Sequence, residues 1–211
     1  MSRHCPRRSG RPCDAKKREA ILSAAIRAFF EHGYTGATIE AIAADASVSK
    51  VTVYKHFHDK DGLFAAAVEA ECEKIRTPLL DGDGKGPLAE RLVRFGMAMN
   101  AFLSRPELVK FERRLAAEIE HLPHLGECFL EAGPRRCHRT LSDLLRNASV
   151  RGELDIDDPI LAADQLSSMF KGMGDLERRF ATQQDPASVE KRIHAAVDMF
   201  MRSYGARECA R

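Results

Sequence analysis

The side chains of this 211-residue chain best suited to chemistry gather between positions 38 and 60, in the segment TIEAIAADASVSKVTVYKHFHDK. If Val53 and Phe57, which lie four residues apart, turn inward on a short helix, a largely polar face is left outward. That face carries Lys50, Val51, Thr52, Lys55 and His56. Ammonium, hydroxyl and imidazole groups donate hydrogen bonds to phosphate oxygens and base edges, so this face is typical of a surface that lies in a nucleic-acid groove.

Two short helices joined by a tight turn must position that face. Ile39, Ile42 and Ala43 give the first helix an apolar stripe, and Thr38 stands where an N-cap hydroxyl satisfies free backbone amides. The pattern then breaks, and Ser49 can cap the second helix. Two helices with this spacing, followed at once by the start of a third, predict a helix-turn-helix DNA reader.

A family resemblance extends this interpretation. The segment REAILSAAIRAFFEHGYTG at 18–36, followed by TIEAIAADASVSKVTVYKHFHDKDGLF at 38–64, resembles the N-terminal DNA-binding domain of the tetracycline-repressor (TetR) family of bacterial transcription regulators. The resemblance implies an all-helical homodimer. It also implies that this domain grips a palindromic operator in double-stranded DNA, and that a larger C-terminal helical domain dimerises and binds an inducer.

The resemblance also implies DNA-contacting residues, mostly for phosphates. The matching positions are Thr38, Ser49, Lys50, Thr52, Tyr54, His56 and Lys60. Thr38 and Lys60 stand at helix N-termini, where free amides and the helix dipole attract an anion. The first turn of the recognition helix enters the groove deepest, so Lys50 is a candidate donor to guanine, and Val51 and Thr52 are candidates for thymine methyl groups.

Each of these residues also has a plainer interpretation. Tyr54 could be a core aromatic, His56 a solvated surface residue, Lys55 a general surface charge, and Thr38 only a helix cap. Ser47 departs from the family, in which many members have glycine in the turn, and a left-handed backbone there would cost serine roughly 1 kcal/mol.

Composition limits the class of protein. Residues 1–60 hold eleven Lys or Arg against six Asp or Glu, so the N-terminal part is positive although the whole chain is only +2. No apolar run approaches the roughly 18 to 20 residues that span a bilayer, and we expect a cytoplasmic protein that contacts no membrane. Six cysteines without metal-binding spacing predict free thiols, no metal site and no cofactor.

The chain organises into three parts. Residues 1–13 hold four arginines without periodic apolar residues, which predicts a disordered basic arm that either follows DNA or is merely solvated. We expect a DNA-binding domain over 14–60, with a first helix from 14 to 32, and a ligand-binding and dimerisation domain over 61–211. A helix capped by Asp59 should run to residue 76, and the glycines and prolines of 77–87 predict a flexible connection close to the domain boundary.

Pro and Gly punctuation predicts five more helices, at 88–104, 107–120, 123–148, 159–180 and 187–204, with Gly133-Pro134 interrupting the third. The fold class is therefore all-α with about nine helices. Within 118–180, HLPHLGECFLEAGPRR and RGELDIDDP resemble the C-terminal domain of a TetR subgroup often associated with efflux control.

Methionine and phenylalanine side chains of the C-terminal half predict a pocket for a small apolar inducer, although such stripes are also typical of plain core. The candidate ligand-binding residues are Phe95, Met99, Phe102, Phe111, Phe129, Met169 and Met173. In the family, the helix expected here at 159–180 pairs with the last helix across the dimer axis. The resemblance therefore implies an interface through Leu166, Phe170, Val197, Met201 and Tyr204. Arg178 and Arg179 should be solvated.

Two other functions remain open from the sequence. A thiol-oxidation sensor could use Cys128 and Cys137 if the Gly-Pro interruption folds them together. An enzyme could draw on acid and base groups at Glu118, Glu120, His121 and His124, but no nucleophile, phosphate loop or metal spacing accompanies them.

Overall fold

The computed structural model describes residues 11–80, 86–180 and 185–206. Its chain divides into two compact units, Met1–Ala67 and Val68–Arg211. Within the described ranges the structure is helical, without a β-strand, and the extended pairing there is one isolated bridge between Leu154 and Gly205. The all-α prediction is confirmed.

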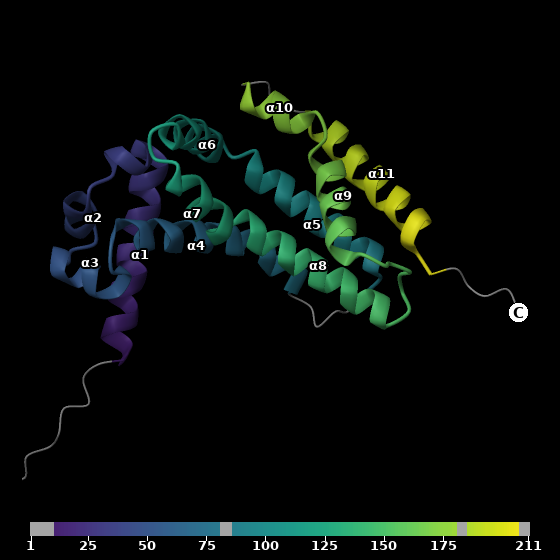
Figure 1. Ribbon diagram of the computed structural model, residues 1–211, viewed down its shortest axis with the longest axis horizontal. Helices are drawn as coiled ribbons and strands as arrows, with labels where there is room; N and C mark the ends of the chain where they lie inside the picture. The colour runs from purple at the N-terminus through teal and green to yellow at the C-terminus, as the bar shows by residue number, and fades with distance from the viewer. Residues whose placement is uncertain (1–10, 81–85, 181–184, 207–211) are drawn as a thin grey trace, which may run out of the picture. The chain divides into compact units, whose positions relative to one another are not determined.

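The helices of the described ranges are labelled in Figure 1. They are α1 (Arg11–Gly36), α2 (Ile39–Asp45), α3 (Lys50–Phe57), α4 (Lys60–Leu80), α5 (Leu88–Leu103), α6 (Pro106–Ile119), α7 (His124–Ala132), α8 (Pro134–Val150), α9 (Pro159–Lys171), α10 (Gly174–Arg179) and α11 (Pro186–Tyr204).

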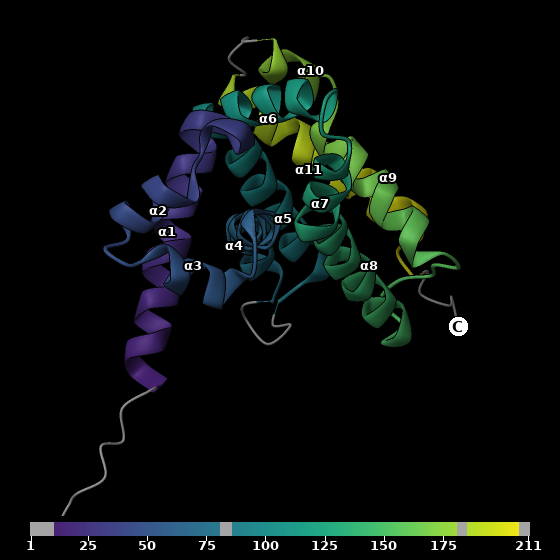
Figure 2. The ribbon, with the colours of Figure 1, turned by 60° about the vertical axis from the view of Figure 1, so that its left-hand side comes forward.

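The first unit is a three-helix domain in which α2 and α3 pack on α1 (Figure 2). Helix α1 begins at Arg11, earlier than the predicted residue 14, and most of the predicted basic arm, residues 1–10, lies outside the described residues. Its buried stripe is Ile21, Ala24, Ala25 and Phe29. Leu22 and Ile26, which flank this stripe, are half-buried.

The first turns of α4 are anchored by aromatic side chains of the same unit. The Phe64 ring packs edge-on against Phe29 and Tyr34, with ring centroids 5.3 and 5.4 Å apart. Asp59 caps this helix as predicted, since its Oδ1 accepts from the Gly62 backbone N–H at 2.7 Å. The helix continues to Leu80, past the predicted end at residue 76, while 81–85 of the expected connection lie outside the described residues.

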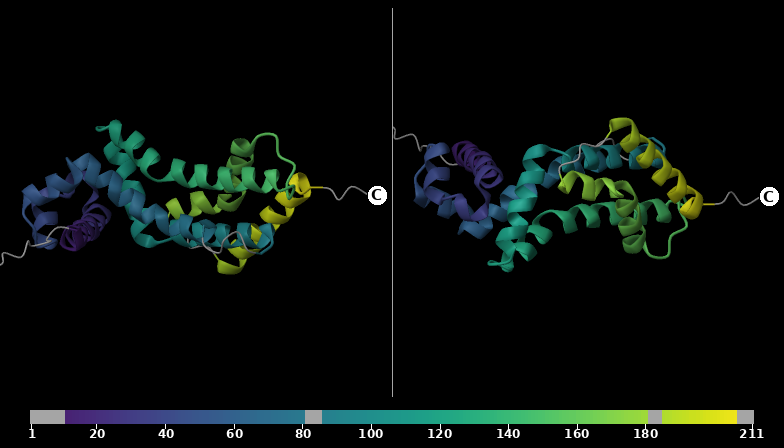
Figure 3. Two further views of the ribbon diagram at one scale, coloured as in Figure 1. Left: turned by 90° about the horizontal axis from the view of Figure 1, so that it is seen from below. Right: turned by 90° about the horizontal axis from the view of Figure 1, so that it is seen from above.

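The core of the second unit lies among α5, α8, α9 and α11, and Figure 3 shows these helices from two sides. Its fully buried side chains include Leu92, Phe95, Leu141, Leu145, Leu166, Phe170, Ile193 and Phe200. Two predicted long helices are each divided in two. Gly133-Pro134 separates α7 from α8 as predicted, and Gly172, with φ 50, ends α9, so the predicted helix 159–180 becomes α9 and α10.

A buried ion-pair network holds α10 against α6. Arg178 is only 8% exposed, and its guanidinium donates to Glu112 and Asp175 carboxylates, both at 2.7 Å, and to the Leu103 carbonyl at 3.2 Å. Burial opposes its charge, but the two carboxylates outweigh burial and raise the pKa of Arg178. The prediction that Arg178 is solvated is therefore wrong, because Glu112 and Leu103, which are distant in the sequence, supply partners that bury it.

The close approach of α5 to α11 requires a glycine at position 96. A Cβ on Gly96 would lie 2.8 Å from the Ile193 Cγ2 and 3.0 Å from the Phe170 Cε1. We expect Gly96→Ala to lower the free energy of unfolding by about 1–2 kcal/mol, because overpacking exceeds the gain in helix propensity. Urea denaturation followed by circular dichroism measures the change.

Gly126→Ala in α7 is the matched control. Its new Cβ would meet Ile119 atoms at 3.6 Å, an ordinary contact, so the variant should keep or raise stability by up to about 1 kcal/mol. Equal stabilities for the two variants would contradict the packing described here.

Candidate nucleic-acid interface and ligand pocket

Helix α3 is oriented by one cap and two buried side chains. Ser49 is its N-cap, and the Ser49 Oγ accepts from the Thr52 backbone N–H at 3.2 Å and contacts the Thr52 Oγ1 at 2.9 Å. Val53 and Phe57 are 1% and 5% exposed. The predicted cap and the predicted inward pair are both confirmed, so the opposite face of α3 is turned to solvent.

The turn before α3 has the conformation that the sequence predicts. Thr38 caps α2, with its Oγ1 accepting from the Ala41 backbone N–H at 3.2 Å. Ser47 has φ 55, in the left-handed region, and backbone hydrogen bonds from Ser47 to Ala44 and from Val48 to Ala43 close the turn. Serine therefore occupies a conformation that favours glycine.

The outward face of α3 exposes several of the predicted contact residues. Val51 is 77% exposed and Tyr54 is 47% exposed, so Tyr54 is not the core aromatic of the plainer interpretation. The Lys50 ammonium pairs with the Glu40 carboxylate of α2. The hydrogen bond from Lys50 lowers the pKa of Glu40, so that this carboxylate stays ionised. Glu40 was missed by the sequence reasoning because the pair joins two helices.

His56 is not outward, and that prediction is wrong. Its side chain is 9% exposed, and its Nε2 lies 3.3 Å from the Asp14 Oδ1 of α1. The ring turns from the groove-facing side toward α1, a placement that the spacing of residues on α3 alone does not determine. The alternative of a solvated histidine is excluded by the same burial.

Lys60 stands at the start of α4 and is held by two groups at the end of α1. Its Nζ lies 4.4 Å from the centroid of the Tyr34 ring and donates to the Thr35 carbonyl at 3.5 Å. The Tyr34 hydroxyl in turn donates to the Asp61 carboxylate. Tyr34 was also missed, because its contact with Lys60 crosses between helices and leaves no periodic signal.

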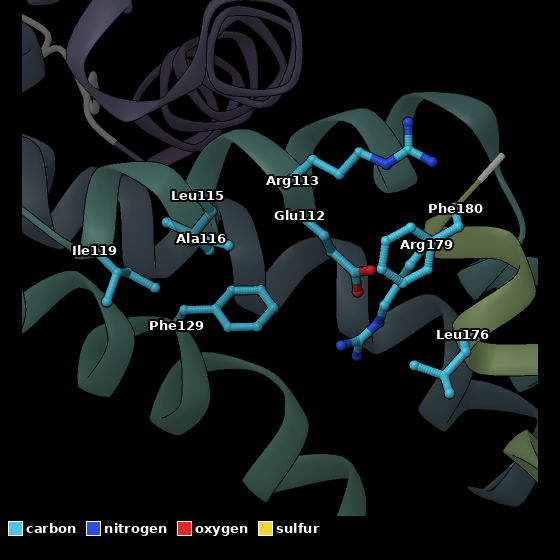
Figure 4. Close-up of a pocket in the computed structure, with 9 residues that line it drawn as sticks. All are labelled: Glu112, Arg113, Leu115, Ala116, Ile119, Phe129, Leu176, Arg179 and Phe180. Carbon is cyan, nitrogen blue, oxygen red and sulfur yellow. The ribbon is translucent and has the colours of Figure 1, made fainter.

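A pocket of about 840 Å³ lies among α6, α7 and α10 of the second unit. Its lining residues are Glu112, Arg113, Leu115, Ala116, Ile119, Phe129, Leu176, Arg179 and Phe180. Figure 4 shows the Phe129 ring turned toward α6, with Leu176 of α10 and Phe180, the residue that follows α10, at the other end. The Glu112 carboxylate is paired with Arg178, and the Arg179 guanidinium with the Asp175 carboxylate at 3.1 Å, while the Arg113 guanidinium donates to the Arg178 carbonyl at 3.3 Å.

Of the seven predicted ligand-binding residues, Phe129 lines this pocket. Phe111 is buried behind it, with ring centroids 6.2 Å apart. Phe95 and Met99 are buried in the core, Phe102 and Met169 pack against that core, and Met173 is 67% exposed. Phe95, Met99, Phe102 and Met169 do not line the pocket because the apolar faces of α5 and α9 are used for packing the unit itself.

Three of the five predicted dimer residues are also core residues. Leu166, Phe170 and Val197 are at most 1% exposed, so their side chains are enclosed within the unit itself. Met201 and Tyr204 are half-buried, and the Tyr204 hydroxyl donates to the Gln165 Oε1 at 2.7 Å. The apolar residues of α9 and α11 are therefore used largely for packing the core of the unit.

The thiol pairing also differs from the prediction. Cys128 and Cys137 lie on α7 and α8, and the thiol beside Cys137 belongs to Cys72 of α4. Among the described residues, no cluster of three or more potential metal ligands occurs, and no helix is both long and apolar enough to cross a bilayer.

A capped helix-turn-helix with an exposed second helix, followed by a helical unit with its own pocket, defines a DNA-binding regulator. Residues 21–67 match the model of the bacterial regulatory proteins of the tetR family. Residues 90–206 match the model of the AefR-like transcriptional repressor C-terminal domain. The chain belongs to the TetR family of transcriptional regulators and is not an enzyme.

Solved structures agree with this assignment. A TetR-family regulator from Mesorhizobium loti is 30% identical, with a TM-score of 0.76 over 93% of this chain and 100% of its own. The flavonoid-responsive regulator FrrA is 30% identical, with a TM-score of 0.70 over 92% of this chain and 100% of its own. The repressor AcnR of Corynebacterium diphtheriae is 36% identical over 58% of this chain and 66% of its own length. Two further repressors, from Mycobacterium tuberculosis and Corynebacterium glutamicum, are matched over 33% and 31% of theirs.

The left-handed backbone at Ser47 generates a stability prediction. We expect Ser47→Gly to raise the free energy of unfolding by up to about 1 kcal/mol, because glycine adopts φ 55 without steric strain. The larger loss of backbone entropy of glycine on folding offsets part of this gain. Thermal melting measures the difference. Ser49→Ala serves as the opposite control, with an expected loss of about 1 kcal/mol from removal of the cap. A Ser47→Gly variant that melts as low as Ser49→Ala would contradict this account of the turn.

Proposed function

We propose that this chain is a homodimeric repressor that binds a palindromic operator and is released from it by a small, largely apolar ligand. The observation that carries the proposal is the outward surface of α3, where Lys50, Val51 and Tyr54 are exposed while the opposite face is buried. A regulator of bacterial genes with this mode of action works in the cytoplasm.

The residues divide into two roles on DNA. Lys50, Val51 and Thr52 occupy the first turn of α3 and would meet base edges, with Lys50 donating to guanine and the methyl-bearing pair contacting thymine. Thr38, Ser49, Tyr54 and Lys60 would contact phosphates, because they carry hydroxyl or ammonium groups at helix N-termini or at the edge of the reading face. His56 is left out of this set because of its burial against α1.

Glu40 gives the interface an internal competitor for Lys50. In the free protein the Lys50 ammonium is neutralised by Glu40, so binding to guanine exchanges one partner for another. A carboxylate beside the reading face also repels phosphate, which disfavours DNA that cannot offer Lys50 a base acceptor. Glu40 would therefore contribute to discrimination between operators.

Dimerisation through α9 and α11 is supported by apolar side chains that remain exposed on them. Leu161 of α9 is 51% exposed and Met199 of α11 is 58% exposed. These residues, with the half-buried Met201 and Tyr204, replace the core residues of the predicted interface. A two-fold dimer would present two α3 helices to successive major grooves, roughly 34 to 36 Å apart.

The chemistry of the pocket favours an aromatic ligand that carries a negative charge. Phe129, Ile119 and Leu115 supply apolar surface, and two arginines stand among the lining residues. Arginine stacks on planar rings and pairs with carboxylate or phenolate oxygens. FrrA responds to flavonoids, which combine flat rings with acidic hydroxyl groups, so we propose a ligand of this type for the present pocket.

Selection of bound DNA from a random pool, by full-length protein, tests the proposed DNA function. We expect the wild type to recover a palindrome, and Lys50→Ala to lose preference at one position of each half-site, by about 1–3 kcal/mol. Tyr54→Phe and Lys60→Ala should weaken binding to all sequences alike, and Lys60→Ala should reduce the salt slope by about one.

Lys55→Ala is the matched control, since it removes one charge from α3 without touching the proposed base-reading turn. It should leave the recovered sequence unchanged. Binding that is unchanged in Lys50→Ala, Tyr54→Phe and Lys60→Ala, or a recovered site without two-fold symmetry, would refute the assignment of roles.

Thermal-shift screening with flavonoids, fatty acids and apolar drugs tests the proposed pocket. Phe129→Ala should reduce affinity for any stabilising compound by roughly tenfold or more, because it removes a ring from the apolar wall. Met173→Ala, at an exposed position that is not among the lining residues, should bind as the wild type does. Equal losses in both variants would place the ligand elsewhere, as would an unchanged affinity in Phe129→Ala.

A further inference from the structure

Two thiols from distant parts of the sequence meet inside the second unit. The Cys137 Sγ of α8 lies 3.8 Å from the backbone carbonyl oxygen of Cys72 of α4, to which the thiol donates a weak hydrogen bond. Gly133, one turn before Cys137, makes the approach possible, because a Cβ there would lie 2.6 Å from the Cys72 Sγ. The Cys72 sulfur therefore lies against the same first turn of α8 that carries Cys137.

The surroundings give the two sulfurs different chemistry. A hydrogen bond from the Cys72 thiol, aided by the positive charge of Arg76, lowers the pKa of Cys137. The same contact with Cys137, together with burial, raises the pKa of Cys72. Cys137 is thus the thiol of the pair that ionises more readily, and Cys72 is the neighbour that keeps its proton.

Exposure follows the same division. Cys137 is half-buried, so a small oxidant can reach it, whereas Cys72 is 8% exposed. A reachable, easily ionised thiol with a second thiol directly beside it is the arrangement in which oxidation ends in a disulfide. Neither residue lies in the α6, α7 and α10 pocket or on α3, so this pair is separate from both proposed sites.

We propose that Cys137 and Cys72 form a reversible disulfide, driven by hydroperoxides, that links α8 to α4. Once ionised, the Cys137 sulfur attacks one oxygen of a hydroperoxide, and the O–O bond breaks. Cys137 becomes a sulfenic acid, and the other oxygen leaves as water or an alcohol after protonation. The Cys72 thiol, on losing its proton, attacks the sulfenic sulfur. The S–S bond forms, the S–O bond breaks, and water leaves. A low-molecular-weight thiol restores both cysteines by exchange.

The position of Cys72 on α4 gives this bond a consequence. Helix α4 begins at Lys60 in the first unit and ends in the second. A covalent link at residue 72 restricts the movement of α4 relative to α8. It therefore also restricts any conformational change that passes along α4 to the DNA-binding unit. An effect on DNA binding rests on the proposed repressor function, whereas the disulfide itself does not.

Peptide mapping of the wild-type protein tests the bond directly. The reduced protein is treated with one equivalent of hydrogen peroxide, remaining thiols are alkylated, and the digest is analysed by mass spectrometry without reductant. We expect a peptide pair joined through Cys72 and Cys137 that disappears on reduction, in the wild type and in the Cys128→Ser control alike. Oxidation confined to Cys128 or to the terminal cysteines would overturn the proposal.

Two further measurements separate the roles of the sulfurs. In Cys72→Ala the sulfenic acid at Cys137 should persist and react with dimedone, and melting curves verify that the variant is folded. In the reduced wild type, Cys137 should be alkylated at least roughly tenfold faster than Cys128 at neutral pH, because a larger fraction of it is thiolate. Equal rates, or no dimedone product in the folded variant, would overturn the assignment of Cys137 as the reactive thiol.

The effect on DNA is measured separately, with the operator recovered from the random pool. Peroxide should weaken binding several-fold in the wild type and in Cys128→Ser, but not in Cys137→Ser. If the disulfide forms and the affinity stays the same, the coupling through α4 is refuted. If the reduced protein binds no DNA at all, the repressor proposal fails while the mapped disulfide stands.

Discussion

The burial of Val53 and Phe57 is the constraint on which the DNA-facing surface depends. Both side chains are almost fully enclosed in the first unit, where α3 packs on α1 and α2. Because they lie four residues apart on one face of an eight-residue helix, enclosing them sets the rotation of α3 about its own axis. Lys50, Val51 and Tyr54 are outward as a consequence, and a polar residue at either buried position would release them.

The second unit uses a different device to shape its pocket. The apolar faces of α5, α8, α9 and α11 pack together to form its core. The pocket forms where the buried Arg178 network holds α10 beside α6. A buried guanidinium that satisfies two carboxylates and a carbonyl gives a specific geometry, since its partners cannot shift without leaving a charge unpaired. The pocket wall is therefore positioned by ion pairs and lined by apolar side chains.

Along the chain, helix α4 connects the unit that carries the DNA-facing surface to the unit that carries the pocket. Phe64 anchors its beginning to Phe29 and Tyr34, and Gly133 lets its later part approach the start of α8 so closely that Cys72 touches the adjoining turn. Helix α4 is thus held in each unit by a different kind of contact. Aromatic rings pack on its first turns, and its later part lies against Gly133 at the start of α8. Any signal that alters the second contact acts on the helix that also carries Lys60.

The sequence by itself determined the features that depend on neighbours within one or two helical turns. The caps at Thr38, Ser49 and Asp59 and the left-handed turn at Ser47 were all predicted, because each is decided by hydrogen bonds and sterics within a few residues. The helical fold class and the family resemblance followed from the same local patterns. Only the tertiary structure decided which way His56 turns, that Leu166 and Val197 are core, that Phe129 lines the pocket, and that Cys72 is the partner of Cys137. These outcomes depend on which helices pack together. A periodic apolar stripe indicates that one face of a helix is buried, but it does not indicate which other helix buries it.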